Sequence, residues 1–399
     1  MRRAFAFLAA CLVLAVSYSA GSDTVVPSDR VSNHVNIRSE PRGEPAEIVG
    51  RLNRGERARF LGSVPYWYHV ELPSGVSGYV SKSWTTREPD APVPASASGG
   101  TLALHFVDVG QGDATLIQCP DGQTILVDAG STDGNVEPSA VRDYISANLD
   151  QNRLGLDVLV VTHPDADHFN LLRDVLNGIT VGHIFRTGKR TDYYDRSIWD
   201  WMNEVAPDRV TDVGPSTHDR VGTPNPVMAC GDADVWILAA GVEASSSPKN
   251  AMSIVLMIRY GDFEAILTGD ATFDTEEVVL ARYGADWLDA DVLKIGHHGS
   301  STTSTSKEWA ETVRPKLAVA SASYGNSYGH PRWTVISRLE PFTEEADPHP
   351  IRFAKKPEGR RHYFVDEDQY REAIYTTAVN GTVVVTSNGQ GFEVRQFAR

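Results

Sequence analysis

Cysteine is scarce in this 399-residue chain, and so is positive charge. Only three cysteines are present, and neither Cys119 nor Cys230 has another Cys or a His nearby at ligand spacing, which argues against a cysteine-based metal site. The 37 Lys and Arg residues are outnumbered by 52 Asp and Glu residues, giving a formal charge of −15. This balance excludes a broad basic surface for nucleic acid, so any polyanion must be held locally, through metal.

Long apolar runs are absent after the N-terminus. The chain starts with Met and two arginines, continues with an apolar run over residues 4–16, and then turns to small and polar residues. This layout predicts a signal peptide over residues 1–21, cut near Ser19 to Gly21, because the run is too short to span a bilayer. We therefore predict an exported protein, periplasmic or secreted, with no transmembrane region in the mature chain.

Two details depend on export. Residues 8–11 also resemble a lipoprotein box, but lipid anchoring at Cys11 is the less favoured alternative because the apolar segment would be unusually short. After cleavage only Cys119 and Cys230 remain, and the loss of Arg2 and Arg3 takes the formal charge from −15 to −17. Thiols in an oxidising compartment can pair, but the sequence leaves open whether these two are close enough.

Short strand-like runs separated by Gly and Pro predict a small all-β barrel over residues 24–86. Four pieces, V-N-I-R-S-E-P (35–41), I-V-G-R-L-N-R-G-E (48–56), W-Y-H-V (67–70) and G-Y-V-S (78–81), resemble a bacterial Src-homology-3-like domain in order and spacing. The resemblance implies a module that binds a cell-wall peptide or peptidoglycan. A simple spacer with a packed Trp67 is the alternative, because a fold does not fix a ligand.

Residues 87–100 are rich in Pro, Ala, Ser and Gly and predict an exposed linker. From residue 101 to 399, strand-like segments such as 157–162 alternate with helical patterns such as 196–205, and residues 381–396 predict a final hairpin that turns at Asn388-Gly389. This alternation predicts one large α/β domain with helices packed over sheet layers.

Four motifs in this second domain carry most of the chemistry, and each follows an apolar strand. They are T-H-P-D-A-D-H (162–168), L-T-G-D (267–270), L-K-I-G-H-H-G-S (293–300) and Y-G-N-S-Y-G-H-P (324–331). Strand ends are where open sheets place ligands, and His with Asp side chains are suited to one or two divalent ions. The sequence therefore predicts a metal site.

The same motifs resemble the metallo-β-lactamase fold family, and within it the hydrolase domain of ComEC-type competence proteins. F-V-D-V-G-Q-G-D-A (106–114), I-L-V-D-A-G (125–130) and N-A-M-S-I-V-L (250–256) complete the match, in family order over residues 102–335. The resemblance implies an αββα sandwich with the metal site in the cleft along the shared edge of its two sheets.

The resemblance also implies roles for individual residues. His163 and Asp165 would face one metal position, Asp167 and His168 the other, and Asp270 would bridge them. One of His297 and His298 would complete the second position, and its neighbour would lie beside the scissile group; the sequence does not choose between them. The implied metal ligands are His163, Asp165, Asp167, His168, Asp270, His297 and His298.

Two positions depart from the common family pattern. Asp165 stands where His is usual, and Asn250 stands where many relatives place a further His ligand. Both departures are shared with the competence branch, and they favour harder ions because they replace nitrogen by oxygen. We expect one or two divalent ions, Zn²⁺ or Mn²⁺, with Mg²⁺ also in competition and the first position weak or empty.

The candidate catalytic residues follow from this arrangement. Asp167 would orient the attacking water, and His330 or the non-ligating member of His297 and His298 would protonate the leaving oxygen. Asn250 belongs to the same candidate set through its position. Asp128 is expected to support the site without binding metal, and a turn role explains Asp113, in the G-Q-G-D motif, almost as well as a role in the site.

These expectations favour an exported metal-dependent phosphodiesterase, most of all a nuclease acting on DNA. A cell-wall-associated phosphoesterase acting on a small or polymer-linked phosphoester is the second enzymatic interpretation, and a β-lactamase is a weaker one. A catalytically inactive cell-wall binding protein is the alternative from another class, although nearly every ligand position carries a competent residue.

Overall fold

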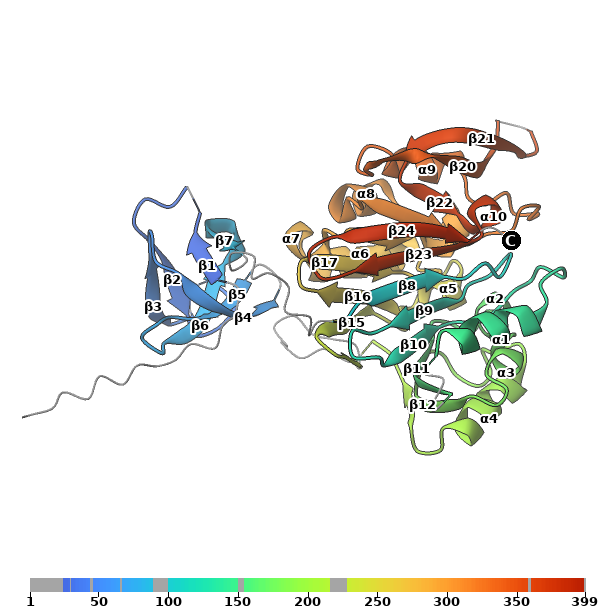
Figure 1. Cartoon of the computed structure of the whole chain (residues 1–399), viewed down its shortest axis with the longest axis horizontal. Coiled ribbons are helices and arrows are strands. Elements are labelled where there is room, and N and C mark those ends of the chain that lie inside the picture. Colours follow the sequence, from blue (N-terminus) through green and yellow to red (C-terminus); the bar gives the residue numbers. More distant parts are fainter. Residues whose placement is uncertain are drawn as a thin grey trace, which may run out of the picture. The chain divides into compact units, whose positions relative to one another are not determined.

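The computed structural model describes residues 24–28, 30–43, 46–64, 67–88, 100–149, 154–215, 228–357 and 360–397. The signal peptide predicted over residues 1–21 and most of the linker predicted over residues 87–100 lie outside the described residues. The chain separates into two compact units between residues 96 and 97 (Figure 1). No helix in the described ranges has the length and apolar character that a membrane crossing requires.

Antiparallel strands build the N-terminal unit. They are β1 (Thr24–Pro27), β2 (His34–Arg38), β3 (Ile48–Asn53), β4 (Ala58–Val64), β5 (Trp67–Glu71), β6 (Ser77–Ser81) and β7 (Thr85–Glu88), with a 3₁₀ turn η1 (Lys82–Trp84) before the last. The strand order is β3-β2-β6-β5-β4-β1-β7. Val25, Ile37, Leu52, Val70 and Val80 are buried in a core of this unit's own. The predicted all-β domain is therefore confirmed.

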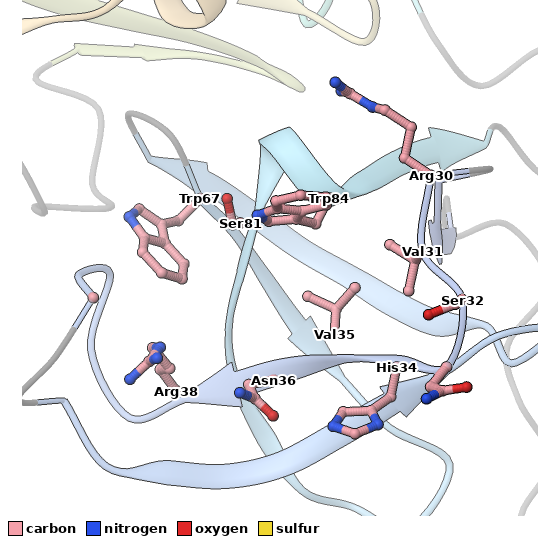
Figure 2. Close-up of a pocket in the computed structure, with 12 residues that line it drawn as sticks. Arg30, Val31, Ser32, His34, Val35, Asn36, Arg38, Trp67, Ser81 and Trp84 are labelled. Carbon is pink, nitrogen blue, oxygen red and sulfur yellow. The ribbon is translucent and has the colours of Figure 1, made fainter.

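Strand β2 has one face in that core and one face outside it. Val35 and Ile37 are buried, and the polar residues that alternate with them point the other way, as the two-residue period of a strand requires. This outer face contributes to a cavity of about 530 Å³ (Figure 2). Its polar lining from β2 is His34, Asn36 and Arg38, and Val35 also lines it.

Two sheets form the centre of the second unit. The first has the order β13-β12-β11-β10-β9-β8-β23-β24. Its strands are β8 (Leu102–Phe106), β9 (Thr115–Gln118), β10 (Thr124–Val127), β11 (Gly155–Val161), β12 (Thr180–Arg186), β13 (Val210–Asp212), β23 (Thr382–Ser387) and β24 (Phe392–Phe397). Strands β10 to β13 run parallel, so their carboxyl ends share one edge.

The second sheet has the order β14-β15-β16-β17-β18-β19-β22. Its strands are β14 (Met228–Cys230), β15 (Ala233–Ala239), β16 (Val255–Tyr260), β17 (Phe263–Leu267), β18 (Val292–Lys294), β19 (Leu317–Ala320) and β22 (Ile374–Thr376). Strands β17, β18, β19 and β22 are parallel to one another. A separate hairpin joins β20 (Glu345–Lys355) to β21 (Tyr363–Glu372).

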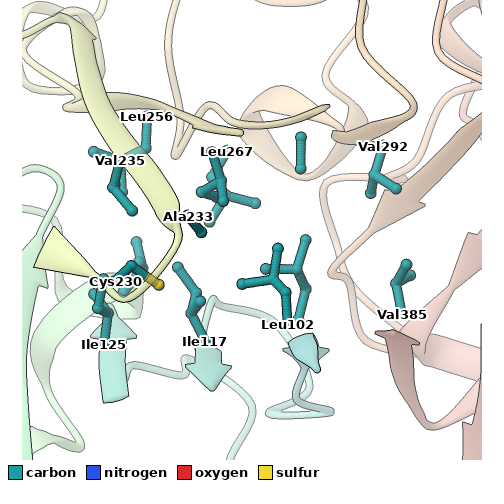
Figure 3. Packing of buried hydrophobic residues seen from close by; sticks show 14 of the residues in the cluster. Leu102, Ile117, Ile125, Cys230, Ala233, Val235, Leu256, Leu267, Val292 and Val385 are labelled. Carbon is teal, nitrogen blue, oxygen red and sulfur yellow. The ribbon is translucent and has the colours of Figure 1, made fainter. Parts of the chain in front are cut away.

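Apolar side chains fill the space between the two sheets. Ile117 and Ile125 of the first sheet meet Val235 and Leu267 of the second (Figure 3). Both faces of the central strands are covered, which explains why strands such as β10 and β19 are buried along their whole length and mostly apolar instead of alternating.

Helices cover the outer faces of both sheets (Figure 1). On the first sheet these are α1 (Pro138–Ala147), α3 (Leu172–Val175) and α4 (Arg196–Val205). On the second they are α6 (Phe273–Arg282), α7 (Ala285–Leu288), α8 (Lys307–Val313) and α9 (Trp333–Leu339). One-turn helices α2 (Ala166–Phe169), α5 (Pro248–Ala251) and α10 (Thr377–Asn380), with the 3₁₀ turn η2 (Gly296–Gly299), lie in connections. The layers run α, β, β, α, so the predicted sandwich is confirmed.

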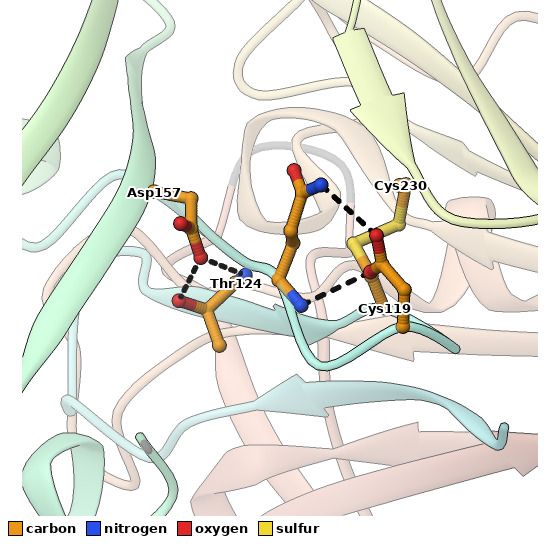
Figure 4. Close-up of a disulfide and its surroundings, with 6 residues drawn as sticks. Cys119, Thr124, Asp157 and Cys230 are labelled. Carbon is orange, nitrogen blue, oxygen red and sulfur yellow. Dashed lines mark hydrogen bonds between the residues drawn. A yellow bond between two sulfur atoms is a disulfide. The ribbon is translucent and has the colours of Figure 1, made fainter. Parts of the chain in front are cut away.

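A disulfide joins the two sheets covalently. Cys119 follows β9 in the first sheet, Cys230 ends β14 in the second, and both are buried (Figure 4). Their Cα atoms lie 5.0 Å apart, within the usual range for a disulfide. The structure thus answers the question that the sequence left open.

Some elements differ from the sequence-based expectation. The helix at Arg196–Val205 and the C-terminal hairpin are confirmed. The helical pattern at residues 171–177 forms only the single turn α3, because Gly178 follows closely and adopts a positive φ of 82°. Strands β14 and β15 and the β20–β21 hairpin were not predicted. β14 is only three residues long, and β20 and β21 are rich in polar residues and lack a clear two-residue period, whereas the apolar run of β15 is a strand signal that the sequence interpretation missed.

Candidate metal centre

The carboxyl ends of β11, β17, β18 and β19 meet at one edge of the sandwich. The loop after β11 leads into α2 and carries the first motif; the loops after β17, β18 and β19 carry the other three. Because β11 belongs to one sheet and the other three strands to the second, the motifs face one another across the boundary between the sheets.

His168 is the most completely fixed side chain of the centre. It is fully buried, and its Nδ1 lies 2.7 Å from Oδ2 of Asp128. Asp128 in turn accepts hydrogen bonds from the backbone N and the hydroxyl of Thr162, at 2.8 and 2.7 Å. A carboxylate at Nδ1 fixes a proton there, which leaves Nε2 as the nitrogen available to a metal ion, and Nε2 lies 3.2 Å from Oδ1 of Asp270.

His298 is oriented in the same manner by a backbone carbonyl. Its Nδ1 donates to the carbonyl of Ser321 at 2.9 Å, and its Nε2 lies 3.4 Å from Oδ2 of Asp167 and 3.5 Å from Oδ2 of Asp270. His297 and His298 both have left-handed backbones, with φ of 46° and 54°. Non-glycine residues rarely adopt this conformation, and it tends to persist where surrounding structure and function require it.

These separations suit a divalent ion. Donors bound at about 2.0–2.2 Å in a tetrahedral arrangement lie roughly 3.4 Å from one another. The distances from Nε2 of His168 to Asp270 and from Nε2 of His298 to Asp167 and Asp270, 3.2 to 3.5 Å, match that spacing. Nε2 of both histidines and Oδ1 of Asp270 are buried and make no hydrogen bond with the described protein atoms, and such unpartnered buried donors fit a metal ion.

Charge within the site couples these groups. Burial opposes ionisation of His168, but the Asp270 and Asp128 carboxylates outweigh burial and raise its pKa well above the ordinary value. Burial would raise the pKa of Asp270, yet His298 and His168 lower that pKa well below its ordinary value. A cation is therefore strongly favoured at this position, and without metal it is supplied by protonated imidazole.

The predicted first position has a different composition. His163 is fully buried; burial and the neighbouring His168 lower its pKa well below the ordinary value, so its imidazole is neutral. Its Nε2 lies 3.8 Å from Oδ2 of Asp165. However, Oδ1 of Asp165 lies 3.3 Å from Nζ of Lys249, and Nδ2 of Asn250 lies 3.5 Å from Asp270. An ammonium group already neutralises the carboxylate that replaces the usual histidine.

Asp113 and Lys294 form a buried ion pair behind the centre. Their Oδ2 and Nζ atoms are 2.9 Å apart, although the angles are not those of a hydrogen bond. Asp113 could itself complete a cluster of metal donors with His168, Asp270 and His298. It lies 3.9 Å from Nδ1 of His168, on the ring side that faces away from Asp270, so we assign it to charge balance with Lys294.

A cavity of about 310 Å³ opens beside the centre. His297, 21% exposed, lines it, and Nδ1 of His297 is 2.8 Å from the Thr303 hydroxyl. His330 and Tyr328 line the same cavity, with their rings stacked at 5.8 Å. Burial, together with His298 and His297, lowers the pKa of His330 to about 3, so His330 is neutral at neutral pH and does not carry an extra proton to donate.

The structure brings the sequence-predicted residues together. Donor atoms of His168, Asp270 and His298 lie close together, and Asp167 reaches the group through His298. His163 and Asp165 lie beside them, and Asn250, His297 and His330 line the cavity. The sequence interpretation missed Lys249 and Lys294. Their only signal was adjacency to predicted motifs, at positions immediately before Asn250 and within L-K-I-G-H-H-G-S.

Comparison with known proteins agrees with this geometry. Residues 33–86 match the bacterial SH3 domain family, and residues 107–220 match the metallo-β-lactamase superfamily. The chain therefore combines a bacterial SH3 domain with a domain of the metallo-β-lactamase superfamily.

Its relatives include proteins of the ComEC competence type. Recombination protein 2 of Haemophilus influenzae is 26% identical over 74% of this chain, ComE operon protein 3 of Bacillus subtilis 29% over 62%, and competence protein ComA of Neisseria gonorrhoeae 29% over 62%. The matches cover 30%, 31% and 30% of those proteins, so this chain corresponds to about a third of their length. Fold, family and the buried donor cluster together support a metal-dependent hydrolase.

Proposed function

We propose that this protein is an exported, metal-dependent phosphodiesterase, with DNA as its favoured substrate. One observation carries the proposal: donor atoms of His168, Asp270 and His298, with Asp167 beside His298, lie at metal-like separations next to a polar cavity. The competence-type relatives support the choice of DNA, and the predicted signal peptide supports export.

The proposed ligands of the main ion are Asp167, His168, Asp270 and His298. When bound, a divalent cation acidifies water and offsets the negative charge of a phosphoester under attack. Asp128 holds His168 in the tautomer that leaves Nε2 unprotonated, and the Ser321 carbonyl does the same for His298. We assign His298 as the ligand and His297 as its partner on the substrate side, because His298 is buried among the donors and His297 faces the cavity.

The chain's own residues then handle substrate and protons. Thr303 orients the His297 ring, which lies at the cavity surface within reach of a leaving oxygen. His330 is neutral, so we assign it as a hydrogen-bonding partner for substrate. This role replaces its earlier place as one of the two candidate proton donors to the leaving oxygen. Lys249, 36% exposed beside Asp165, offers a positive charge to a non-bridging phosphate oxygen.

A direct test compares three substrates with the purified chain. We expect hydrolysis of bis(p-nitrophenyl) phosphate and nicking of plasmid DNA with Mn²⁺ or Zn²⁺, loss of both with a chelator, and no hydrolysis of a chromogenic β-lactam. Asp270→Ala should abolish both activities, and Asp121→Ala, which removes an exposed carboxylate that does not line the cavity beside the centre, should not.

Three results would count against the proposal. Activity that survives in Asp270→Ala would belong to a contaminant. A folded chain that takes up no divalent ion would favour the inactive binding protein, and hydrolysis confined to phosphoesters of cell-wall polymers would favour the second enzymatic interpretation.

A further inference from the structure

The cavity of the N-terminal unit combines aromatic and basic side chains. Trp67 and Trp84 lie on either side of Ser81, and Arg38 lies near Trp67 (Figure 2). Trp84 is 52% exposed, which is unusual for so large an apolar ring. Arg30 approaches the same ring, its guanidinium carbon 6.0 Å from the ring centroid.

Polar groups in this cavity are held in place. Arg30 donates to the Ser83 carbonyl at 3.1 Å and Arg38 to the Ala46 carbonyl at 2.9 Å, so both guanidinium groups are oriented by backbone and keep further donors. Oδ1 of Asn36 is buried and accepts no hydrogen bond from the described residues. The described lining contains no Asp or Glu.

Charge is distributed unequally along the chain. Residues 24–88 hold nine Lys and Arg against seven Asp and Glu, a formal charge of +2. Residues 101–399 hold 26 Lys and Arg against 43 Asp and Glu, a formal charge of −17. The hydrolase unit by itself therefore repels a polyanion at long range, and the N-terminal unit does not.

We propose that the N-terminal unit binds single-stranded nucleic acid in this cavity, with phosphates on Arg30 and Arg38 and bases stacked on Trp67 and Trp84. The inference rests on the proposed nuclease function and adds where the substrate is captured. Single strands are favoured over duplexes because only unpaired bases offer their faces to aromatic rings, and guanidinium groups beside exposed rings are the usual combination for such binding.

Alternative ligands fit this cavity less well. A neutral glycan would use the two rings but leave two oriented guanidinium groups without partners. A peptide of the cell wall would use the arginines through its carboxylates, yet offers no planar ring for each tryptophan. A single strand supplies both a phosphate and a planar base in every repeat.

The test measures binding of the full chain to a fluorescein-labelled oligothymidylate by anisotropy, in EDTA so that cleavage is blocked. We expect salt-sensitive binding that Trp84→Ala weakens by at least about fivefold, the lower range for loss of one base stack. Arg30→Ala with Arg38→Ala should lower the slope of log affinity against log salt by about 1.4, which is roughly 0.7 for each lost phosphate contact.

A matched control removes the same charge outside the cavity. Arg51→Ala with Arg54→Ala, two exposed residues on or next to β3, should leave affinity and slope close to the native values. Arg30→Lys with Arg38→Lys should recover most of the slope, which separates charge from misfolding. Native thermal midpoints in all variants would confirm intact folding.

Three outcomes would overturn the inference. The first is no binding of the oligonucleotide, and the second is an equal loss of oligonucleotide affinity in the control pair. The third is a chain that does not bind the oligonucleotide but binds a peptidoglycan disaccharide-peptide, with that binding abolished by Trp84→Ala. Hydrolysis of bis(p-nitrophenyl) phosphate distinguishes the two proposals. Hydrolysis without oligonucleotide binding rejects only the capture site, and binding without hydrolysis rejects only the proposed enzyme.

Discussion

Asp128 supports the candidate metal centre through its contact with His168. Its carboxylate accepts from Nδ1 of His168 and from Thr162, and its φ is 59°. Asparagine tolerates this backbone conformation, so Asp128→Asn changes charge and hydrogen bonding with little strain. We expect metal affinity to fall by about 10- to 100-fold, the usual effect of losing such a partner.

Competition with a chromogenic chelator measures that loss. Asp157→Asn is the control, because Asp157 accepts hydrogen bonds from the Thr124 backbone N and hydroxyl near the disulfide and lies on β11 away from its carboxyl end (Figure 4). Equal affinity in Asp128→Asn and the native protein would show that His168 is not a ligand.

Lys249 leads to a prediction about stoichiometry. Its ammonium group lies 3.3 Å from Asp165 and occupies the side of the centre where the family pattern implies a first ion. We expect one tightly bound ion per native chain. Lys249→Gln should strengthen a second ion by at least about tenfold, since even in water a unit charge a few ångströms from a divalent ion opposes it by about 2 kcal/mol.

Isothermal titration with Mn²⁺ counts the ions directly, and Lys307→Gln is a matched control on the exposed surface of α8. Two tight ions in the native chain would contradict the prediction.

The same position shows what the sequence can and cannot predict about the site. Asp165 and Asn250 were recognisable as departures from a motif, but the ammonium group that compensates for them depends on a contact between separate loops.

At the scale of elements, the disulfide links strands of two different sheets. Cys119 and Cys230 enclose a long loop, with a sequence separation of 111 residues, and each belongs to a different sheet. A cross-link over about 100 residues stabilises a fold by roughly 2–5 kcal/mol, chiefly by restricting the unfolded chain. We expect reduction to lower the free energy of unfolding by that amount.

Urea denaturation with and without dithiothreitol tests this. The double variant Cys119→Ser with Cys230→Ser should resemble the reduced protein and show no response to the reductant. If the native midpoint is unchanged by complete reduction, the cross-link does not stabilise the sandwich.

Glu276 on α6 gives a pH-dependent prediction. Burial raises its pKa to about 7, although the backbone N of Ser306 donates to it at 2.9 Å. Because the folded pKa exceeds the unfolded value, the folded state binds more protons between them. The stabilisation is therefore complete below about pH 4.5 and is lost as the pH rises through about 7, by at most about 3 kcal/mol.

Glu276→Gln should remove this part of the pH dependence. Thermal unfolding at several pH values between about 5 and 8 compares the two proteins, because the variant carries no proton to lose in that window. If the unfolding midpoints of the two proteins change with pH in parallel, ionisation of Glu276 does not lower the stability of the folded state.

The elements also differ in how well sequence predicted them. Helix α4 has a strong period of apolar residues and an N-cap at Asp195, whose side chain accepts from the Ser197 backbone, and its bounds were predicted fully. β14 is three residues long and forms because Cys230 and the antiparallel neighbour β15 hold it in the sheet. Such strands depend on tertiary pairing, which local sequence does not encode.

For the whole molecule, family motifs and charge counts were sufficient to predict two domains and a metal site. They did not predict which domain would capture the substrate and which would cleave it. The excess of negative charge argued against long-range attraction of a polyanionic substrate. The cavity bounded by Trp67, Trp84 and Arg38 changes that interpretation, since its rings and guanidinium groups come from separate strands and a turn. No local motif marks that combination.

Ionic strength should therefore affect substrates of different size differently. A small phosphodiester needs only the cavity beside Asp270, so its hydrolysis should change little with added NaCl. Cleavage of single-stranded DNA should fall steeply with salt, because capture depends on phosphate contacts that compete with counterions.

The double variant Arg30→Ala with Arg38→Ala should show the same effect without added salt. Its KM for DNA should rise several-fold, while kcat and the hydrolysis of the small substrate should stay unchanged. Steady-state kinetics at several salt concentrations test this, and a salt response common to both substrates would place the effect in the hydrolase unit instead.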